Sequence, residues 1–258
     1  MTTKRMNRVL LSEENQVYRV GNLVERPGRP WSASILRILR HFEACNLPVE
    51  RYISADNNIQ ISEFAEGEMV HPGKWTDEAL YNIGQLLARL HSAAREFETT
   101  DKDVWRPWYL REIGNKANYI CCHGDIAPWN TITENGLVKT LVDWECAGPL
   151  DPMVEIARVC WLFVQLHDDD LAKLHNLPSA EKRAQQVRIV ADGYGLEAAR
   201  RKHLVSQIIE VIICETAHEA IDPGLTFDSV GSLWGFAWRT RSLYWVWRNR
   251  AVLETALL

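Results

Sequence analysis

Short apolar runs separated by turn residues fill the first quarter of the chain and predict a small sheet. These runs cover residues 16–20, 23–26, 49–54 and 59–64. A Gly-Asn pair between the first two suits a two-residue hairpin, because such turns need residues that tolerate positive φ. Ser32 then stands before apolar residues at helical spacing, from Ile35 to Phe42, and this pattern predicts one capped helix over 33–45.

Helical patterns dominate from residue 77 onward. Thr76 precedes two acidic residues and an apolar stripe that runs to Leu90, which predicts a capped helix over 77–95. Further helices are expected over 153–167, 180–193, 200–219 and 229–253. A sheet with one helix, followed by a helical region, places the chain in the α+β class.

A short strand-forming segment interrupts the helical region. Residues 119–122 form an apolar run that is typical of a buried strand. Residues 131–133 and 137–142 predict two further strands, and Asn135-Gly136 between them suits a hairpin turn. The sequence therefore predicts a strand followed by a hairpin.

Three oxygen-bearing side chains lie where these strands meet. Asp125 is on the loop after the first strand, Asn130 begins the hairpin and Asp143 ends it. We therefore expect the three to converge at one end of a small sheet. Asn130 and Asp143 offer the oxygen ligands that Mg²⁺ prefers, and Asp125 can orient an attacking hydroxyl and accept its proton. This set of groups suits phosphoryl transfer.

Composition and charge limit the classes of binding partner that we expect for this protein. The 258 residues are 47% hydrophobic, which is enough for one domain or two small lobes. The formal net charge is −5 and no basic stripe stands out, so nucleic acid is not an expected partner. No apolar run suits a membrane span or a leader, so we expect a cytoplasmic protein without a membrane partner. The six cysteines lack metal-site spacing, and we expect buried, reduced thiols.

A spaced motif carries a resemblance to a known family. It consists of His123, Gly124, Asp125, Asn130, Asp143, Trp144 and Glu145. This pattern resembles that of the aminoglycoside phosphotransferase and choline kinase family, and its Asp and Asn are spaced as in the protein kinase catalytic loop. The resemblance implies a protein-kinase-like bilobal fold. A small antiparallel-sheet N-lobe would span residues 1–65, and a mostly helical C-lobe would span 66–258.

The resemblance also implies roles on the nucleotide side. Arg26 stands where the family places a lysine against the phosphates, and Glu43 is the candidate partner for its charge. The Glu63 carbonyl and the Ala65 N–H would meet a purine edge at the hinge between the lobes. No glycine-rich loop precedes Arg26. The segment around Arg26 is also similar to a bacterial subgroup that often carries phosphotransferase or trifolitoxin-immunity-like labels.

Roles follow for the catalytic loop and the substrate side. Asp125 would be the catalytic base, and His123 would orient its loop. Glu145 would face the substrate. Asp151, on the same side, would mainly have a structural role and buttress the loop as a hydrogen-bond acceptor for the backbone or for His123. The acidic stretch at 168–170 could bind a cation, but a solvated helix end is the favoured interpretation.

The leading hypothesis is an ATP-dependent, or GTP-dependent, kinase that moves a γ-phosphate to a hydroxyl of a small molecule with Mg²⁺. The first alternative is a nucleotide-binding immunity or regulatory protein with little kinase activity. The second is a metal-dependent hydrolase that uses Asp125, Asn130 and Asp143, although further metal-ligand spacing is missing.

Overall fold

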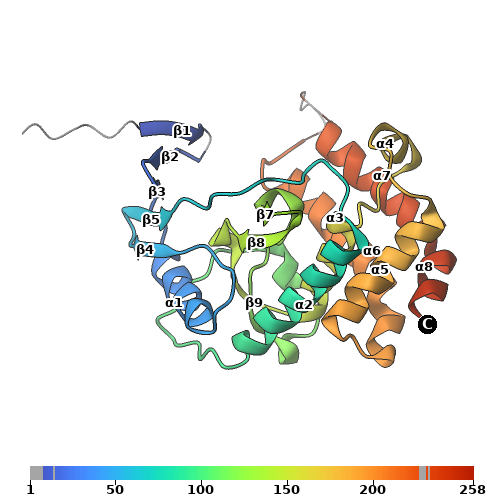
Figure 1. Ribbon diagram of the computed structural model, residues 1–258, viewed down its shortest axis with the longest axis horizontal. Coiled ribbons are helices and arrows are strands. Elements are labelled where there is room, and N and C mark those ends of the chain that lie inside the picture. Colours follow the sequence, from blue (N-terminus) through green and yellow to red (C-terminus); the bar gives the residue numbers. More distant parts are fainter. Residues whose placement is uncertain (1–7, 14, 227–230, 232) are drawn as a thin grey trace, which may run out of the picture.

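An antiparallel five-stranded sheet forms one end of the molecule, at the left of Figure 1. The computed structural model describes residues 8–13, 15–226, 231 and 233–258. The strands, in the spatial order β1-β2-β3-β5-β4, are β1 (Arg8–Ser12), β2 (Val17–Val20), β3 (Leu23–Pro27), β4 (Tyr52–Ala55) and β5 (Ile59–Glu63). Strand β1 was not predicted. Its apolar residues are consecutive and exposed, so the alternation that marks a half-buried strand is missing.

Helix α1 (Ser32–Ala44) connects this sheet to the rest of the core. It buries Ile35, Leu39 and Phe42, and the Phe42 ring lies 5.5 Å from the ring of Trp144. Ser32 is the first helical residue and not the N-cap, because its Oγ accepts a hydrogen bond from the backbone N–H of Arg29. The expected cap at Ser32 is therefore wrong.

Two small antiparallel pairs lie between the sheet and the helices. They are formed by β6 (Ile120–Cys122) with β9 (Gly148–Leu150), and by β7 (Thr131–Glu134) with β8 (Leu137–Leu141). Asn135 and Gly136 form the β7–β8 turn with positive φ, as predicted. A parallel bridge between Val49 and Leu141 places the hairpin against the chain that leads into β4.

Helices build the other end of the molecule (Figure 1). They are α2 (Asp77–Ala94), α3 (Pro152–Phe163), α4 (Asp169–Leu174), α5 (Ala180–Tyr194), α6 (Ala198–Ile221), α7 (Trp234–Arg248) and α8 (Arg250–Leu257). Thr76 caps α2 as predicted, since its Oγ1 accepts from the Ala79 N–H. The helix expected over 229–253 is two helices that meet at Asn249, and its positions 229, 230 and 232 lie outside the described residues.

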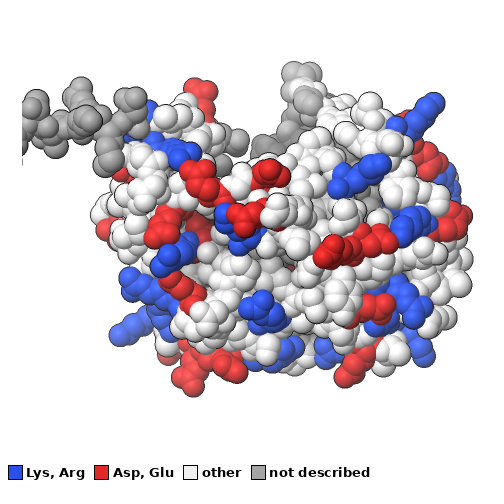
Figure 2. Space-filling model, viewed as in Figure 1, with Lys and Arg blue, Asp and Glu red and all other residues white. Residues whose placement is uncertain are grey.

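The antiparallel sheet followed by a helical region confirms the predicted α+β, kinase-like class. None of the described helices is long and apolar enough to cross a membrane. On the face seen in Figure 2, acidic and basic side chains are interspersed. All six cysteines are free, and four are buried as expected, whereas Cys45 is exposed and Cys214 is half-buried.

Candidate active site

The base of the β7–β8 hairpin carries two of the predicted site residues. Asn130 ends a short 3-10 turn directly before β7, and Asp143 follows β8 by two residues. The Val142 N–H donates to the Asn130 carbonyl at 3.0 Å, which closes the hairpin at this end. Asp125 lies on the loop after β6. The structure therefore brings the three residues together.

The Asn130 amide holds Asp125 against the hairpin. Its Nδ2 donates to the Asp125 carbonyl and to the Asp125 carboxylate Oδ2, both at 2.9 Å. Because both contacts use the amide nitrogen, the Oδ1 atom of Asn130 is left as an acceptor. An amide oxygen fixed in this way is a suitable ligand for a hard cation.

Asp143 presents its carboxylate to the cleft from an unusual backbone conformation. Its φ of 65° is left-handed, and its N–H donates to Glu50 Oε2 at 3.2 Å. Within the described part of the chain, the carboxylate accepts no hydrogen bond, and Arg26 Nη1 lies 3.8 Å from Oδ1. Burial raises the pKa of Asp143, and the Arg26 charge opposes that rise. The carboxylate is therefore partnered by a cation but not saturated.

The partner of Arg26 is Glu50 and not Glu43. Arg26 Nη2 lies 2.8 Å from Glu50 Oε1, and this carboxylate also accepts from Ser62 Oγ at 2.7 Å. Glu43 pairs instead with Arg51 at 2.9 Å on the surface. The predicted Arg26–Glu43 pair is wrong because the last turn of α1 directs Glu43 to solvent, whereas Glu50 enters the core beside β8.

A buried arginine holds the candidate base. Arg158 on α3 places Nη2 2.7 Å from Asp125 Oδ1 and donates from Nη1 to the Ile126 carbonyl. Its Nε donates to Glu215 of α6 at 2.9 Å, and both side chains of this pair are 3% exposed. Burial raises the pKa of Asp125, and the Arg158 charge opposes the rise.

Sequence reasoning missed Glu50, Arg158 and Glu215. Arg158 had a signal, because it lies inside the apolar run 156–164, and Glu215 had a weaker one, because it directly follows the apolar run 211–214; Glu50, which is followed by Arg51, had none. Charged residues are seldom fully buried unless they are paired, so a charge in such a run marks a buried partner. The periodic pattern does not say which partner.

His123 is placed to orient the loop. Its Nε2 donates to the Val142 carbonyl at 3.1 Å, and its Nδ1 accepts from the Asp125 N–H at 3.2 Å. Burial lowers the pKa of His123, so the neutral ring with its proton on Nε2 fits both contacts. The ring also packs on Trp144, with centroids 4.3 Å apart.

Asp151 does not face a substrate. It is 4% exposed and caps α3, with Oδ1 accepting from Met153 N–H and Oδ2 from Asn115 N–H. Both carboxylate oxygens accept from backbone N–H groups, which agrees with the structural role expected of Asp151 and leaves it no part in contacting a substrate. The catalytic loop is braced by Glu155 instead. Glu155 Oε1 accepts from the Gly124 N–H at 2.6 Å, and Oε2 lies 2.8 Å from His91 Nε2.

A cavity of about 250 Å³ lies between the sheet and the hairpin. Its walls include Ser12, Asn15, Arg26, Arg29, Gln60, Trp129, Asn130, Asp143 and Glu145. Glu145 is ion-paired with Arg106 and is about one-third exposed. Ser12 and Asn15 of the β1–β2 hairpin therefore form one wall of the cavity. The cavity joins Arg26 to the two candidate metal ligands.

The hinge residues lie at the edge of β5. The Glu63 carboxylate is near Arg51 Nη1, at 3.4 Å, and the Phe64 N–H donates to the Asn22 carbonyl. Across the described residues, the half-buried Ala65 N–H has no hydrogen-bond partner. The backbone roles expected of Glu63 and Ala65 stay predictions.

The acidic stretch at 168–170 is ion-paired. Asp168 caps α4 and contacts Arg241, and Asp169 contacts Arg248 and the Trp245 indole. These arginines occupy the carboxylates that a cation would need.

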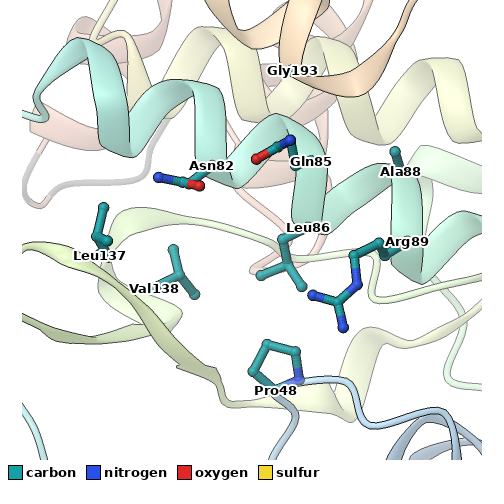
Figure 3. Close-up of a pocket in the computed structure, with 9 residues that line it drawn as sticks. All are labelled: Pro48, Asn82, Gln85, Leu86, Ala88, Arg89, Leu137, Val138 and Gly193. Carbon is teal, nitrogen blue, oxygen red and sulfur yellow. The ribbon is translucent and has the colours of Figure 1, made fainter.

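A larger cavity, of about 580 Å³, is separate from this site (Figure 3). Asn82, Gln85 and Arg89 extend from α2 on one side, and Leu137 and Val138 of the hairpin lie opposite. None of the predicted site residues lines it. Size alone therefore does not locate the chemistry in this molecule.

Comparisons with known proteins agree with this geometry. A model of the phosphotransferase enzyme family matches residues 105–203. The trifolitoxin immunity protein of Rhizobium leguminosarum bv. trifolii is 38% identical over 247 residues, which cover 93% of this chain and 94% of that protein. The chain belongs to the phosphotransferase enzyme family.

This phosphotransferase family member shares its fold with several solved structures. Amicoumacin kinase in complex with AMP-PNP, Ca²⁺ and Ami has a TM-score of 0.69 at 12% identity, over 98% of this chain and 89% of that one. An aminoglycoside phosphotransferase from Alicyclobacillus acidocaldarius has a TM-score of 0.59 at 14% identity, over 99% and 92%. The predicted family resemblance is confirmed.

Proposed function

We propose that the protein transfers the γ-phosphoryl group of ATP or GTP to a hydroxyl of a small molecule, with Mg²⁺. One observation carries the proposal. Asp125 lies next to Asn130, and Asn130, Asp143 and Arg26 border one cleft. A positioned carboxylate that can accept a proton, two oxygen ligands and a phosphate-binding cation are the groups that phosphoryl transfer needs.

The donor set fits magnesium. The Asn130 Oδ1 and the Asp143 carboxylate are hard oxygen ligands, and neither is used by a hydrogen bond in the described residues. Two such ligands leave room for water and phosphate oxygens, which is the usual coordination of Mg²⁺ in proteins. When bound there, the ion neutralises charge on the transferred phosphoryl group.

The other residues have separate tasks. Arg26, held by Glu50, presents its second Nη group toward Asp143 and the phosphate side of the cleft. Asp125 accepts the proton of the acceptor hydroxyl, and Arg158 and Asn130 fix its carboxylate for that purpose. Glu145, which is ion-paired with Arg106, borders the same cleft, and we assign it to the acceptor side.

The division of labour between the lobes belongs to the same proposal. Residues 1–65 would bind the nucleotide, with the Glu63 carbonyl and the Ala65 N–H at the purine edge. Residues 66–258 would carry the catalytic loop and the acceptor site. AMP-PNP and Ca²⁺ in the amicoumacin kinase complex support a nucleotide and a divalent cation in this fold.

A second candidate function is favoured by one comparison. The relative with 38% identity is an immunity protein, so nucleotide binding with little phosphoryl transfer is the competing hypothesis. Both functions require binding, and only the first requires turnover. The metal-dependent hydrolase hypothesis has no such support.

Two variants test the proposal. Asp143→Ala should abolish the Mg²⁺-dependent thermal stabilisation by ATP, because a ligand of the native state raises its stability by mass action. Asp125→Asn should retain that stabilisation and lower turnover by about 10²–10⁴-fold, the effect of removing a positioned base. Asp101→Ala, at an exposed carboxylate, is the control and should change neither.

The acceptor is found first, by measuring ADP release with a panel of hydroxyl compounds. Near-normal turnover by Asp125→Asn would reject the role of the base. Equal stabilisation of Asp143→Ala and the parent would reject the metal site. A parent that binds ATP and phosphorylates nothing would favour the immunity function.

A further inference from the structure

A cavity of about 440 Å³ is the second one that borders the catalytic loop. Its walls include His71, Trp129, His167, His175, Trp238 and Arg239. Trp129 follows Asp125 by four residues and also lines the cleft that holds Asn130 and Asp143. The two cavities therefore share one wall, and that wall is part of the catalytic loop.

The lining of this second cavity is aromatic and ordered. The Trp238 ring stacks on the buried Trp161 with centroids 5.2 Å apart, and its Nε1 donates to His167 Nδ1 at 3.2 Å. The His71 ring meets Trp129 edge-on at 5.5 Å. Burial lowers the pKa of His167 to about 4, so the ring is neutral at pH 7 and carries its proton on Nε2.

The cavity contains no carboxylate among its described lining residues. Burial and the neighbouring His175 also lower the pKa of His71. Among the described lining residues, Arg239 carries the permanent positive charge. Its Nη2 lies 3.2 Å from Glu219 and 3.6 Å from Glu215, and neither carboxylate is part of the lining. The Arg239 Nε atom is buried and has no hydrogen-bond partner in the described chain. The described part of the wall therefore offers no carboxylate to a bound cation, and the Arg239 Nε atom is a donor that lacks an acceptor.

A chain of ion pairs connects this cavity to the base. Glu215 contacts Arg239 on one side and Arg158 on the other, and Arg158 contacts Asp125. A ligand bound against Arg239 is thus linked to Asp125 through Glu215 and Arg158. A hydroxyl compound held between Trp129 and Trp238 would lie on the acceptor side of the loop.

We propose that this cavity is the acceptor site and that it takes an aromatic or apolar hydroxyl compound that is uncharged or anionic, not a polycation. The role as acceptor site rests on the proposed phosphotransferase function. The preference for an aromatic or apolar ligand does not depend on that function. Aromatic walls supply stacking area, and Arg239 and His167 supply donors for carbonyl, hydroxyl or anionic groups.

Binding is tested with 8-anilinonaphthalene-1-sulfonate, an aromatic anion, by its fluorescence on the full chain. The parent should bind it at one site. Trp238→Leu should weaken binding about tenfold or more, as for truncation of an aromatic anchor. Trp247→Leu is the matched control, since this residue lies on the same helix, is 62% exposed and lies outside the cavity. His175→Glu tests charge, and it should weaken dye binding without loss of a core contact.

The polycation kanamycin is the opposing probe. It should not displace the dye from the parent at millimolar concentration, and it should not stimulate ADP release. Displacement by kanamycin, or equal effects of Trp238→Leu and Trp247→Leu, would overturn the inference. Phosphorylation of kanamycin would support the proposed function and overturn this inference. Absent nucleotide binding with intact dye binding would count against the proposed function alone.

Discussion

Removal of Arg158 should be among the most damaging single changes in the molecule. The guanidinium is 3% exposed and makes three contacts: to Asp125 at 2.7 Å, to Glu215 at 2.9 Å and to the Ile126 carbonyl at 3.0 Å. Arg158→Met fills similar volume but leaves Glu215 buried, with Arg239 at 3.6 Å as its nearest remaining cation. Breaking a buried ion pair by removing one partner costs about 3–5 kcal/mol.

That loss is a large share of the free energy of unfolding, which is about 5–15 kcal/mol for ordinary domains. Urea unfolding, followed by tryptophan fluorescence, should show it as a lower midpoint. Arg248→Met is the matched control. Its guanidinium is 45% exposed and pairs with Asp169 on the surface, so the loss should be much smaller.

The double variant Arg158→Met with Glu215→Gln sharpens the test. Replacing the carboxylate removes the buried charge that Arg158→Met leaves without its main partner. The two changes together should therefore cost less than the sum of the single changes, by about 0.5–3 kcal/mol. Strictly additive effects, or a loss below about 1 kcal/mol for Arg158→Met, would refute the reasoning.

A catalytic readout separates positioning from stability. Arg158→Lys keeps the charge, but one ammonium cannot replace a guanidinium that reaches two carboxylates and a carbonyl. We expect Arg158→Lys to retain Mg²⁺-dependent ATP binding, because Asn130 and Asp143 are unchanged, while its turnover falls. Loss of ATP binding in a folded Arg158→Lys variant would contradict the separation.

Two further changes test the neighbouring contacts. Arg26→Ala should weaken ATP more than adenosine in calorimetry, since only ATP offers phosphates; equal loss of both would indicate a disturbed sheet. Burial alone would raise the pKa of Glu155, but the hydrogen bonds from His91 and the Gly124 N–H outweigh it and hold that pKa below its ordinary value of 4.5. A carboxylate with a lowered pKa stabilises the folded state above its pKa in the unfolded chain. This stabilisation is lost as the pH falls through the pKa in the folded protein. Destabilisation by Glu155→Gln in urea should therefore stay constant from pH 7 to about pH 4.5 and shrink only at lower pH, and a loss that does not change below pH 4.5 would contradict this.

Local chemistry made the catalytic hairpin predictable. An Asn-Gly pair between two apolar runs specifies a turn within a few residues, and that turn places Asn130 and Asp143 at one end whatever surrounds them. The same holds for Thr76, whose cap needs only the next three residues. These features depend on short stretches of chain, so the sequence contains all that determines them.

Long-range pairing was not predictable in this way. Glu43 and Glu50 follow Arg26 by 17 and 24 residues, and only the path of the chain after α1 decides which one reaches it. Arg158 and Glu215 are 57 residues apart, and no periodic pattern links them. Helices α7 and α8 were merged because no glycine or proline marks their junction at Asn249.

The contacts divide the site into two supports that meet at Asn130. On one side, Glu50 contacts both Arg26 and the Asp143 N–H, so the phosphate-side cation and the metal ligand are held by one carboxylate. On the other, Arg158 holds Asp125 from the helical region. Asn130 contacts both supports. Its carbonyl accepts from the Val142 N–H, next to Asp143, and its amide donates to Asp125.

This arrangement has a consequence for variants. Changes at Glu50 should alter nucleotide and metal affinity together, because Arg26 and Asp143 depend on the same carboxylate. Changes at Arg158 should act on transfer and leave affinity in place. Asn130→Ala should be the change that removes both, since it takes away a metal ligand and a donor to the base at once. A variant of Asn130 that lost only affinity or only turnover would show that the two supports do not meet there.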